Sequence, residues 1–78
     1  MNIYPNPATD HIYISVQDQN ELASASLYDY TGREVSYITV TGRNASLSVK
    51  GLSAGVYLLR VDMADRNIIP TNRKITIE

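Results

Sequence analysis

Residues 11–16 read His-Ile-Tyr-Ile-Ser-Val, so apolar and polar side chains alternate through the whole segment. Successive side chains of a β-strand point to opposite faces, and the alternation therefore predicts a strand. Ile12, Ile14 and Val16 form its apolar face, which we expect to lie on a hydrophobic core. No window of about eleven or more residues keeps the three-to-four spacing of an amphipathic helix, so we expect strands in the rest of the chain as well.

The residues before this strand form a second, shorter one. Asn2-Ile3-Tyr4 is followed by Pro5-Asn6-Pro7, and each proline fixes its own φ angle and lacks an amide donor. A hydrogen-bonded ladder does not continue through such a segment. We therefore expect Asn2-Ile3-Tyr4 to be an edge strand.

A third strand and a tight turn follow. The alternation resumes after a polar turn, with Ala23, Ala25 and Leu27 on the predicted inner face. Asp29-Tyr30-Thr31-Gly32-Arg33 then predicts a hairpin, because Gly32 can adopt the positive φ that a type II turn or a G1 bulge requires.

The return strand of this hairpin spans residues 33–41 and has an irregular pattern. Val35 and Ile38 are three residues apart, which breaks the alternation and predicts a β-bulge near Ser36-Tyr37. After a further turn, residues 45–50 alternate again and predict a fifth strand.

Two more strands complete the chain. Residues 56–61 are apolar on both parities except at Arg60, a pattern typical of a central strand that is covered on both faces. Lys74-Ile75-Thr76-Ile77-Glu78 alternates to the last residue, so we expect the chain to end on a strand. That strand either pairs as the last member of a sheet or presents an edge that another protein reads.

Seven short strands separated by turns predict an all-β fold, a seven-stranded antiparallel immunoglobulin-like β-sandwich, with a small barrel as the alternative. The chain has 78 residues, which predicts one domain over residues 1–78. It has no cysteine, so the fold depends on apolar packing and strand pairing without disulfides.

Charge and hydropathy exclude two classes of partner. Seven basic and eight acidic residues give a net charge of -1, which offers no electrostatic attraction to a nucleic-acid backbone. No apolar run approaches the roughly 18 residues of a membrane span, so we expect no stable membrane insertion. The first residues also lack the basic and apolar regions of a secretory signal.

The inventory of reactive side chains favours a protein that is not an enzyme. The single histidine, His11, would need an aspartate and a serine to form a triad, and no serine lies in a recognisable nucleophile context. One histidine without cysteine does not make a zinc site. Asp18-Gln19-Asn20-Glu21, and Asp62 with Asp65, offer oxygen ligands but match no calcium loop, so we favour polar turns and leave calcium open. We assign no catalytic, cofactor-binding or metal-binding residue.

Three tyrosines fall on the outward parity of their strands or in a turn: Tyr13, Tyr28 and Tyr30. They are interpreted either as a platform for a sugar or peptide, in an immunoglobulin-like adhesin module, or as cross-strand aromatic pairs that stabilise a sheet. We favour the aromatic pairs.

Four blocks of the chain form an ordered series of motifs. They are Tyr4-Pro5-Asn6-Pro7-Ala8-Thr9-Asp10, Leu27-Tyr28-Asp29-Tyr30-Thr31-Gly32-Arg33-Glu34-Val35, Leu52-Ser53-Ala54-Gly55-Val56-Tyr57-Leu58-Leu59-Arg60-Val61 and Lys74-Ile75-Thr76-Ile77. Together, over residues 3–78, they resemble the C-terminal sorting domains of the type IX secretion system, type A family. The resemblance implies a seven-stranded immunoglobulin-like sandwich, which agrees with the strand pattern.

The resemblance also implies a function. The domain would be the C-terminal targeting module of a larger exported precursor, and Met1 would begin a piece excised from it. The precursor crosses the inner membrane through its own N-terminal signal, and the folded domain then directs passage from the periplasm through the outer-membrane translocon. A sortase-like peptidase at the cell surface removes the domain, and the cargo is released or joined to lipopolysaccharide. The implied partners are the translocon, its outer-membrane shuttle barrel and this peptidase, with no cofactor.

Particular residues carry over by motif. Tyr4, Pro5, Asn6 and Pro7 mark the opening segment, Gly32 and Arg33 the hairpin, Gly55 and Tyr57 the glycine-tyrosine strand, and Lys74, Ile75, Thr76, Ile77 and Glu78 the end that the translocon recognises. Two features depart from the family pattern. Residues 67–73 lack the glycine often found there, and the chain ends on Glu78 where many relatives end on a basic residue. The domain is expected as a monomer or a strand-exchanged dimer.

Overall fold

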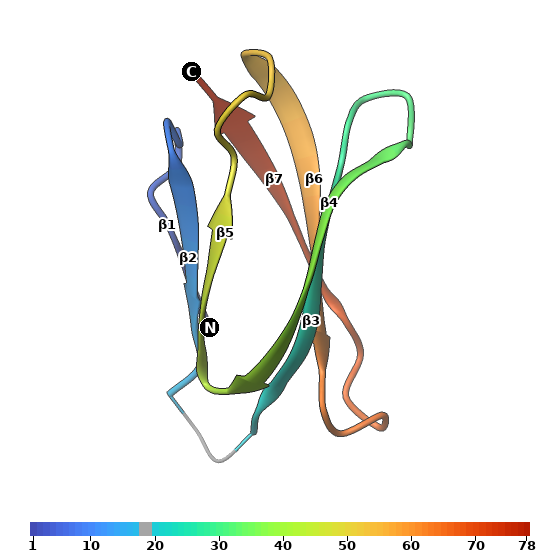
Figure 1. Cartoon of the computed structure of the whole chain (residues 1–78). Helices are drawn as coiled ribbons and strands as arrows, with labels where there is room; N and C mark the ends of the chain where they lie inside the picture. Colours follow the sequence, from blue (N-terminus) through green and yellow to red (C-terminus); the bar gives the residue numbers. More distant parts are fainter. Residues whose placement is uncertain (18–19) are drawn as a thin grey trace.

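Two antiparallel β-sheets pack face to face in the computed structural model of the chain, which describes residues 1–17 and 20–78 (Figure 1). These residues form seven strands and no helix, and hence no helix that could span a membrane. The strands are β1 (Asn2–Tyr4), β2 (His11–Ser15), β3 (Leu22–Tyr28), β4 (Glu34–Gly42), β5 (Asn44–Ser48), β6 (Gly55–Met63) and β7 (Thr71–Ile77). The predicted immunoglobulin-like sandwich is confirmed. The acidic turn predicted at residues 18–21 lies partly outside the described residues.

The strands are divided between a sheet of order β1-β2-β5 and a sheet of order β4-β3-β6-β7. β1 lies at an edge, as predicted, and pairs with β2 from Asn2↔Ser15 to Tyr4↔Tyr13. The connections β1–β2, β3–β4 and β5–β6 lie at the same end of the sandwich as the C-terminus (Figure 1). The segments that carry the four sequence motifs are therefore gathered at or near one end of the fold.

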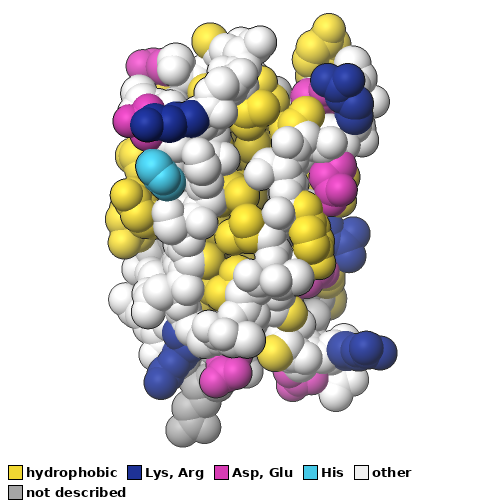
Figure 2. All heavy atoms as spheres, in the orientation of Figure 1, with side chains coloured by type: hydrophobic (Ala, Val, Ile, Leu, Met, Phe, Trp, Pro, Cys, Tyr) yellow, Lys and Arg dark blue, Asp and Glu magenta, His cyan; other side chains and the backbone are white. Residues whose placement is uncertain are grey.

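The hydrophobic core lies between the two sheets. Ile12 and Ile14 of β2 are buried, as the alternation predicts, and they belong to the same core cluster as Leu59 and Val61 of β6. Hydrophobic side chains fill the space between the layers, and charged side chains lie on the outside (Figure 2). Val16 comes just after β2 and is partly buried against this core.

The predicted inner face of β3 is wrong at its first residue. Leu22 is buried, whereas Ala23 is only partly buried and does not belong to the core. The reason is a shift of register between Leu22 and Ser24, which appears in the pairing of β3 with both β4 and β6. Beyond the shift, Ala25 and Leu27 face the core as predicted.

The bulge predicted in β4 is present but lies one residue earlier. Leu27 pairs with Ser36 and Tyr28 pairs with Glu34, so Val35 is the extra residue. Its apolar side chain packs partly against the core. Because of the bulge, the side chains of Val35 and Ile38 both point toward the core, although the two residues are three positions apart.

β6 is central, as predicted, but it is not covered on both faces. It lies between β3 and β7, and its residues alternate between buried and exposed. Val56 is 48% exposed and Leu58 is 44% exposed, whereas Leu59 is fully buried. A sandwich covers only the inner face of each sheet, and the apolar residues of the outer parity remain at the surface.

Candidate functional site

The predicted recognition segment belongs to β7, the outer strand of the four-stranded sheet. β7 spans Thr71–Ile77, so it begins three residues before the predicted strand, and Glu78 lies just beyond its end. Pairing with β6 starts at Val61↔Thr71, directly after Pro70. Pro70 lacks an amide donor, and it limits the strand on this side.

The side chains of β7 divide between the core and the surface. Ile75 and Ile77 are buried and anchor the strand to the core. Lys74 and Glu78 are exposed, and Thr76 is half-buried. A partner would therefore meet the charged side chains and the outer backbone edge, whereas the two isoleucines serve the fold.

The outer edge of β7 is covered by residues 6–8, which we call the cover segment. The side chain of Asn6 replaces a neighbouring strand: its Nδ2 donates to the Lys74 carbonyl at 3.2 Å, and its Oδ1 accepts from the Thr76 amide at 3.0 Å. One side chain thus pairs with both a donor and an acceptor of an edge that would otherwise be open.

Ala8 continues this pairing with its backbone. Its amide donates to the Thr76 carbonyl at 2.8 Å and its carbonyl accepts from the Glu78 amide at 2.9 Å, which forms a parallel bridge to Ile77. The Ala8 side chain is fully buried in the core. Pro7, the preceding residue, has no backbone N–H group to donate on the side of the cover segment that faces away from β7. A further strand therefore has no regular ladder to join at the cover segment.

The contact between Asn6 and β7 is not predicted by the local sequence pattern. Pro5 and Pro7 predict only the end of an edge strand, and Asn6 stands out only as part of a motif. The available signal was an asparagine between two prolines, because Asn side chains commonly pair with backbone groups in turns. Its partners lie 68 and 70 residues away along the chain, a distance that no local pattern reports.

The inner side of β7 pairs with the glycine-tyrosine block of β6. Gly55 lies opposite Ile77, and Tyr57 lies opposite Ile75. The Tyr57 ring is buried, and its hydroxyl donates to the Ser53 carbonyl at 2.6 Å, which joins the preceding loop to the strand. Gly55 has a φ of +156°, a conformation that favours glycine. The motif positions of β6 therefore support the terminal strand from within the sheet.

Gly32 and Arg33 lie in the hairpin between β3 and β4. The Gly32 amide donates to the Asp29 carbonyl at 3.0 Å, and Gly32 has a φ of +87°. A type II turn would need positive φ at Thr31, and no described residue other than glycine has it. The G1 bulge, one of the two predicted alternatives, is therefore the observed one.

The carboxylate of Asp29 holds this hairpin together. It accepts hydrogen bonds from the Thr31 hydroxyl, the Thr31 amide at 2.9 Å and the Arg33 amide at 3.1 Å. The Arg33 guanidinium lies 3.4 Å from its other oxygen. The hydrogen bond from the Thr31 hydroxyl is the largest cause that lowers the pKa of Asp29, followed by the backbone amides and the nearby Arg33 charge.

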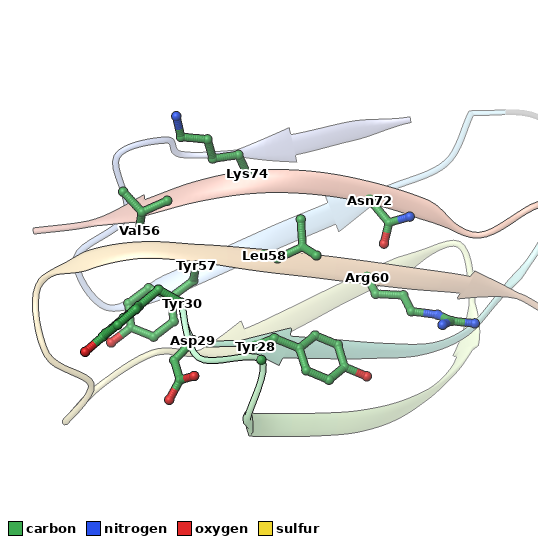
Figure 3. A pocket seen from close by; sticks show the side chains of 10 residues that line it. Tyr28, Asp29, Tyr30, Val56, Tyr57, Leu58, Arg60, Asn72 and Lys74 are labelled. Atoms are coloured by element: carbon green, nitrogen blue, oxygen red, sulfur yellow. The ribbon is translucent and has the colours of Figure 1, made fainter.

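A shallow groove lies on the outer face of the four-stranded sheet. Val56 and Leu58 of β6 line it, with Tyr28 of β3 on one side and Lys74 of β7 on the other (Figure 3). The groove is apolar along its floor and carries a positive charge beside the terminal strand.

The three outward tyrosines do not form one platform. Tyr13 lies in the three-stranded sheet, whereas Tyr28 and Tyr30 belong to the other sheet and its hairpin. Tyr13 stacks on Tyr4 across the β1–β2 pair at 5.7 Å between ring centroids, and on His11 at 6.1 Å. The structure therefore supports cross-strand stacking for Tyr13. The alternative interpretation, in which Tyr13, Tyr28 and Tyr30 share one binding face, is wrong.

Two of the carboxylates weighed as calcium ligands, those of Asp62 and Asp65, are engaged in other contacts. Asp62 forms an ion pair with Arg60 at 3.2 Å and accepts from the Ser24 hydroxyl, and Asp65 accepts from the Asn67 amide. Within residues 1–17 and 20–78, no three His, Asp or Glu side chains gather where they could hold a metal ion.

Comparisons with known proteins agree with this architecture. The sequence model of a family described as a secretion system C-terminal sorting domain matches residues 2–78. β-Agarase A of Zobellia galactanivorans is 25% identical over 67 residues, which are 86% of this chain and 12% of that protein. The chain thus spans about an eighth of the length of that relative. No solved structure matches.

The family match extends from β1 to the end of β7 and includes the cover segment, the hairpin and the glycine-tyrosine strand. The chain therefore belongs to the family of type IX secretion system C-terminal sorting domains.

Proposed function

We propose that this domain ends a longer precursor and directs that precursor through the type IX outer-membrane translocon, after which a sortase-like peptidase removes the domain upstream of β1. The family match over residues 2–78 carries this proposal. The family is a sorting signal rather than a catalytic domain, and its cargo is secreted or displayed on the surface of Gram-negative bacteria. The proposed partners are the translocon, the outer-membrane shuttle barrel and the peptidase.

The proposed recognition surface is the end of the sandwich that holds the C-terminus. Lys74 and Glu78 are exposed there, and their opposite charges lie on either side of the buried Ile75 and Ile77. The translocon would read these side chains and the neighbouring backbone on a folded domain. In this role the domain is a substrate of the export machinery.

Deleting the last five residues would be an ambiguous test. The deletion removes Ile75 and Ile77 from the core together with the exposed residues. Loss of export would then follow from unfolding as readily as from loss of recognition. Substitutions confined to exposed side chains separate the two effects.

The test is therefore a charge exchange, Lys74→Glu with Glu78→Lys, in a fluorescent reporter that carries an inner-membrane signal and this domain at its C-terminus. The matched control exchanges Glu21→Lys and Arg66→Glu, two exposed residues in the β2–β3 and β6–β7 connections, away from the C-terminus. Both pairs leave the net charge unchanged.

In a type IX-competent bacterium, we expect the unmodified fusion and the control to reach the surface or the medium without the domain. The charge exchange in β7 should reduce delivery of the reporter by about tenfold or more. The melting temperature of this variant should stay near that of the control. An unmodified fusion retained in the periplasm, folded and uncleaved, would refute the sorting role and would favour the adhesin module.

A further inference from the structure

We propose that the outer edge of β7 is a strand-addition site, and that the cover segment occupies this site until an extended strand of the export machinery replaces it. This inference rests on the proposed sorting function and adds the place and the chemistry of recognition. The partner is an extended peptide segment that pairs with a sheet edge through its backbone.

The edge offers a regular row of backbone groups. The amide and the carbonyl of Thr76 both point away from β6, because they bond the cover segment. Backbone groups alternate along an antiparallel strand, so those of Lys74 and Asn72 point the same way. Asn6 reaches the Lys74 carbonyl, but no described residue forms a hydrogen bond with the outward groups of Asn72. The edge is therefore covered at its C-terminal end and open at its N-terminal end.

Few hydrogen bonds join the cover segment to β7. Among the described residues there are four, and two of them come from the side chain of Asn6 alone. The prolines on both sides of Asn6 prevent it from extending into a longer ladder. A regular strand that also paired with Asn72 would make more backbone hydrogen bonds to β7 than the cover segment does.

The cover segment also connects the two ends of the chain. Only Pro5 separates it from β1, and β1 is a three-residue strand of the opposite sheet. Residues 2–8 therefore join both sheets: they pair with β2 through β1 and with β7 through the cover segment. Displacement of residues 2–8 would therefore uncover the outer edge of β7. In the proposed precursor, β1 is also the part of the domain nearest the cargo.

The buried Ala8 defines the side chain that the partner must supply. Its methyl group is fully buried in the core, so an incoming strand must place a small apolar side chain at the same position. The remaining contacts would be backbone hydrogen bonds, with Lys74 and Glu78 beside the incoming strand. We therefore expect the partner strand to carry Ala, Val or a similar residue there.

The first measurement is hydrogen exchange in the whole domain. Asn6→Ala removes two of the four bonds at an exposed position, and Asn67→Ala is the control, because the Asn67 side chain is exposed and forms no hydrogen bond with the described residues. We expect Asn6→Ala to speed exchange of the Thr76 and Glu78 amides about 10- to 100-fold, the factor for two hydrogen bonds. Exchange of core amides such as Leu59 should change much less.

The second measurement is binding to the purified outer-membrane shuttle barrel of a type IX system. If only the uncovered domain binds, the apparent Kd is the intrinsic Kd divided by the uncovered fraction. Asn6→Ala should then tighten binding by the same factor by which it speeds exchange at Glu78, because the acceptor of that amide, the Ala8 carbonyl, is retained in the variant. Asn67→Ala should not tighten binding. In the complex, the Thr76 and Glu78 amides should be protected again.

The outcomes separate the inference from the function on which it rests. Exchange at Glu78 that Asn6→Ala leaves unchanged, or faster exchange at Glu78 without tighter binding, would overturn the strand-addition site while leaving the sorting role in place. Thr76 and Glu78 amides that stay unprotected in the complex would overturn it equally. Failure of every variant to bind, together with failure of the reporter to be exported, would instead reject the proposed function.

Discussion

Replacing Leu59 by alanine should destabilise the domain far more than replacing Leu58, its neighbour in β6. Leu59 is fully buried between the sheets, whereas Leu58 is 44% exposed on the outer face. A Leu→Ala change at a buried site removes its transfer free energy and leaves a cavity, at a cost of about 2 to 5 kcal/mol. The same change at Leu58 opens no enclosed cavity and should cost about 1 kcal/mol or less.

These costs are large compared with the stability of so small a domain. At about 0.05 to 0.15 kcal/mol per residue, a chain of 78 residues has a free energy of unfolding of roughly 4 to 12 kcal/mol. Leu59→Ala would remove a large part of it, and the melting temperature would fall by about 4 to 8 °C for each kcal/mol. Leu58→Ala should stay within about 8 °C of the parent domain.

The assay is urea unfolding, followed by far-UV circular dichroism and by tyrosine fluorescence. Both variants change the same residue type in the same strand, so β-propensity and chain entropy are matched. Equal losses of unfolding free energy, or a greater loss for Leu58→Ala, would refute the assignment of the two faces of β6. Such a result would restore the expectation of a strand covered on both sides.

Three further changes test the hairpin and the β5–β6 loop. Gly32→Ala should cost about 1 to 2 kcal/mol, because its φ of +87° suits glycine, and an unchanged melting temperature would contradict this. Tyr57→Phe should cost about 0.5 to 1.5 kcal/mol through loss of the hydroxyl bond to Ser53, and equal urea midpoints would show that the bond contributes nothing. The lowered pKa of Asp29 means that its stabilising contribution is present above the ordinary value of 3.8 and is lost as the pH falls through the folded-state pKa. Asp29→Asn should therefore lower stability at neutral pH and weaken its acid dependence below about pH 4, and parallel pH profiles of the two proteins would refute the assignment.

Local alternation predicted the elements of this fold well where one face of a strand is buried. Ile12 and Ile14 lie in the core as the period of two required, and the terminal strand buries Ile75 and Ile77. The turn at Gly32 was also predictable, because only glycine suits its backbone conformation. Prediction failed at Ala23, where a register shift set by two neighbouring strands overrides the alternation.

Three properties could be predicted from the amino-acid sequence: the all-β class, the inward-facing residues of most strands, and the family. These properties depend on local order and on ordered motifs. The arrangement of the strands in space was needed to show which side of β6 stays open, that Tyr13 and Tyr28 lie on different sheets, and that Asn6 and Ala8 cover the edge of β7. These features were not predictable because strand pairing joins residues far apart in the chain. The alternation within a strand specifies its two faces, but it does not specify what lies beside its edge.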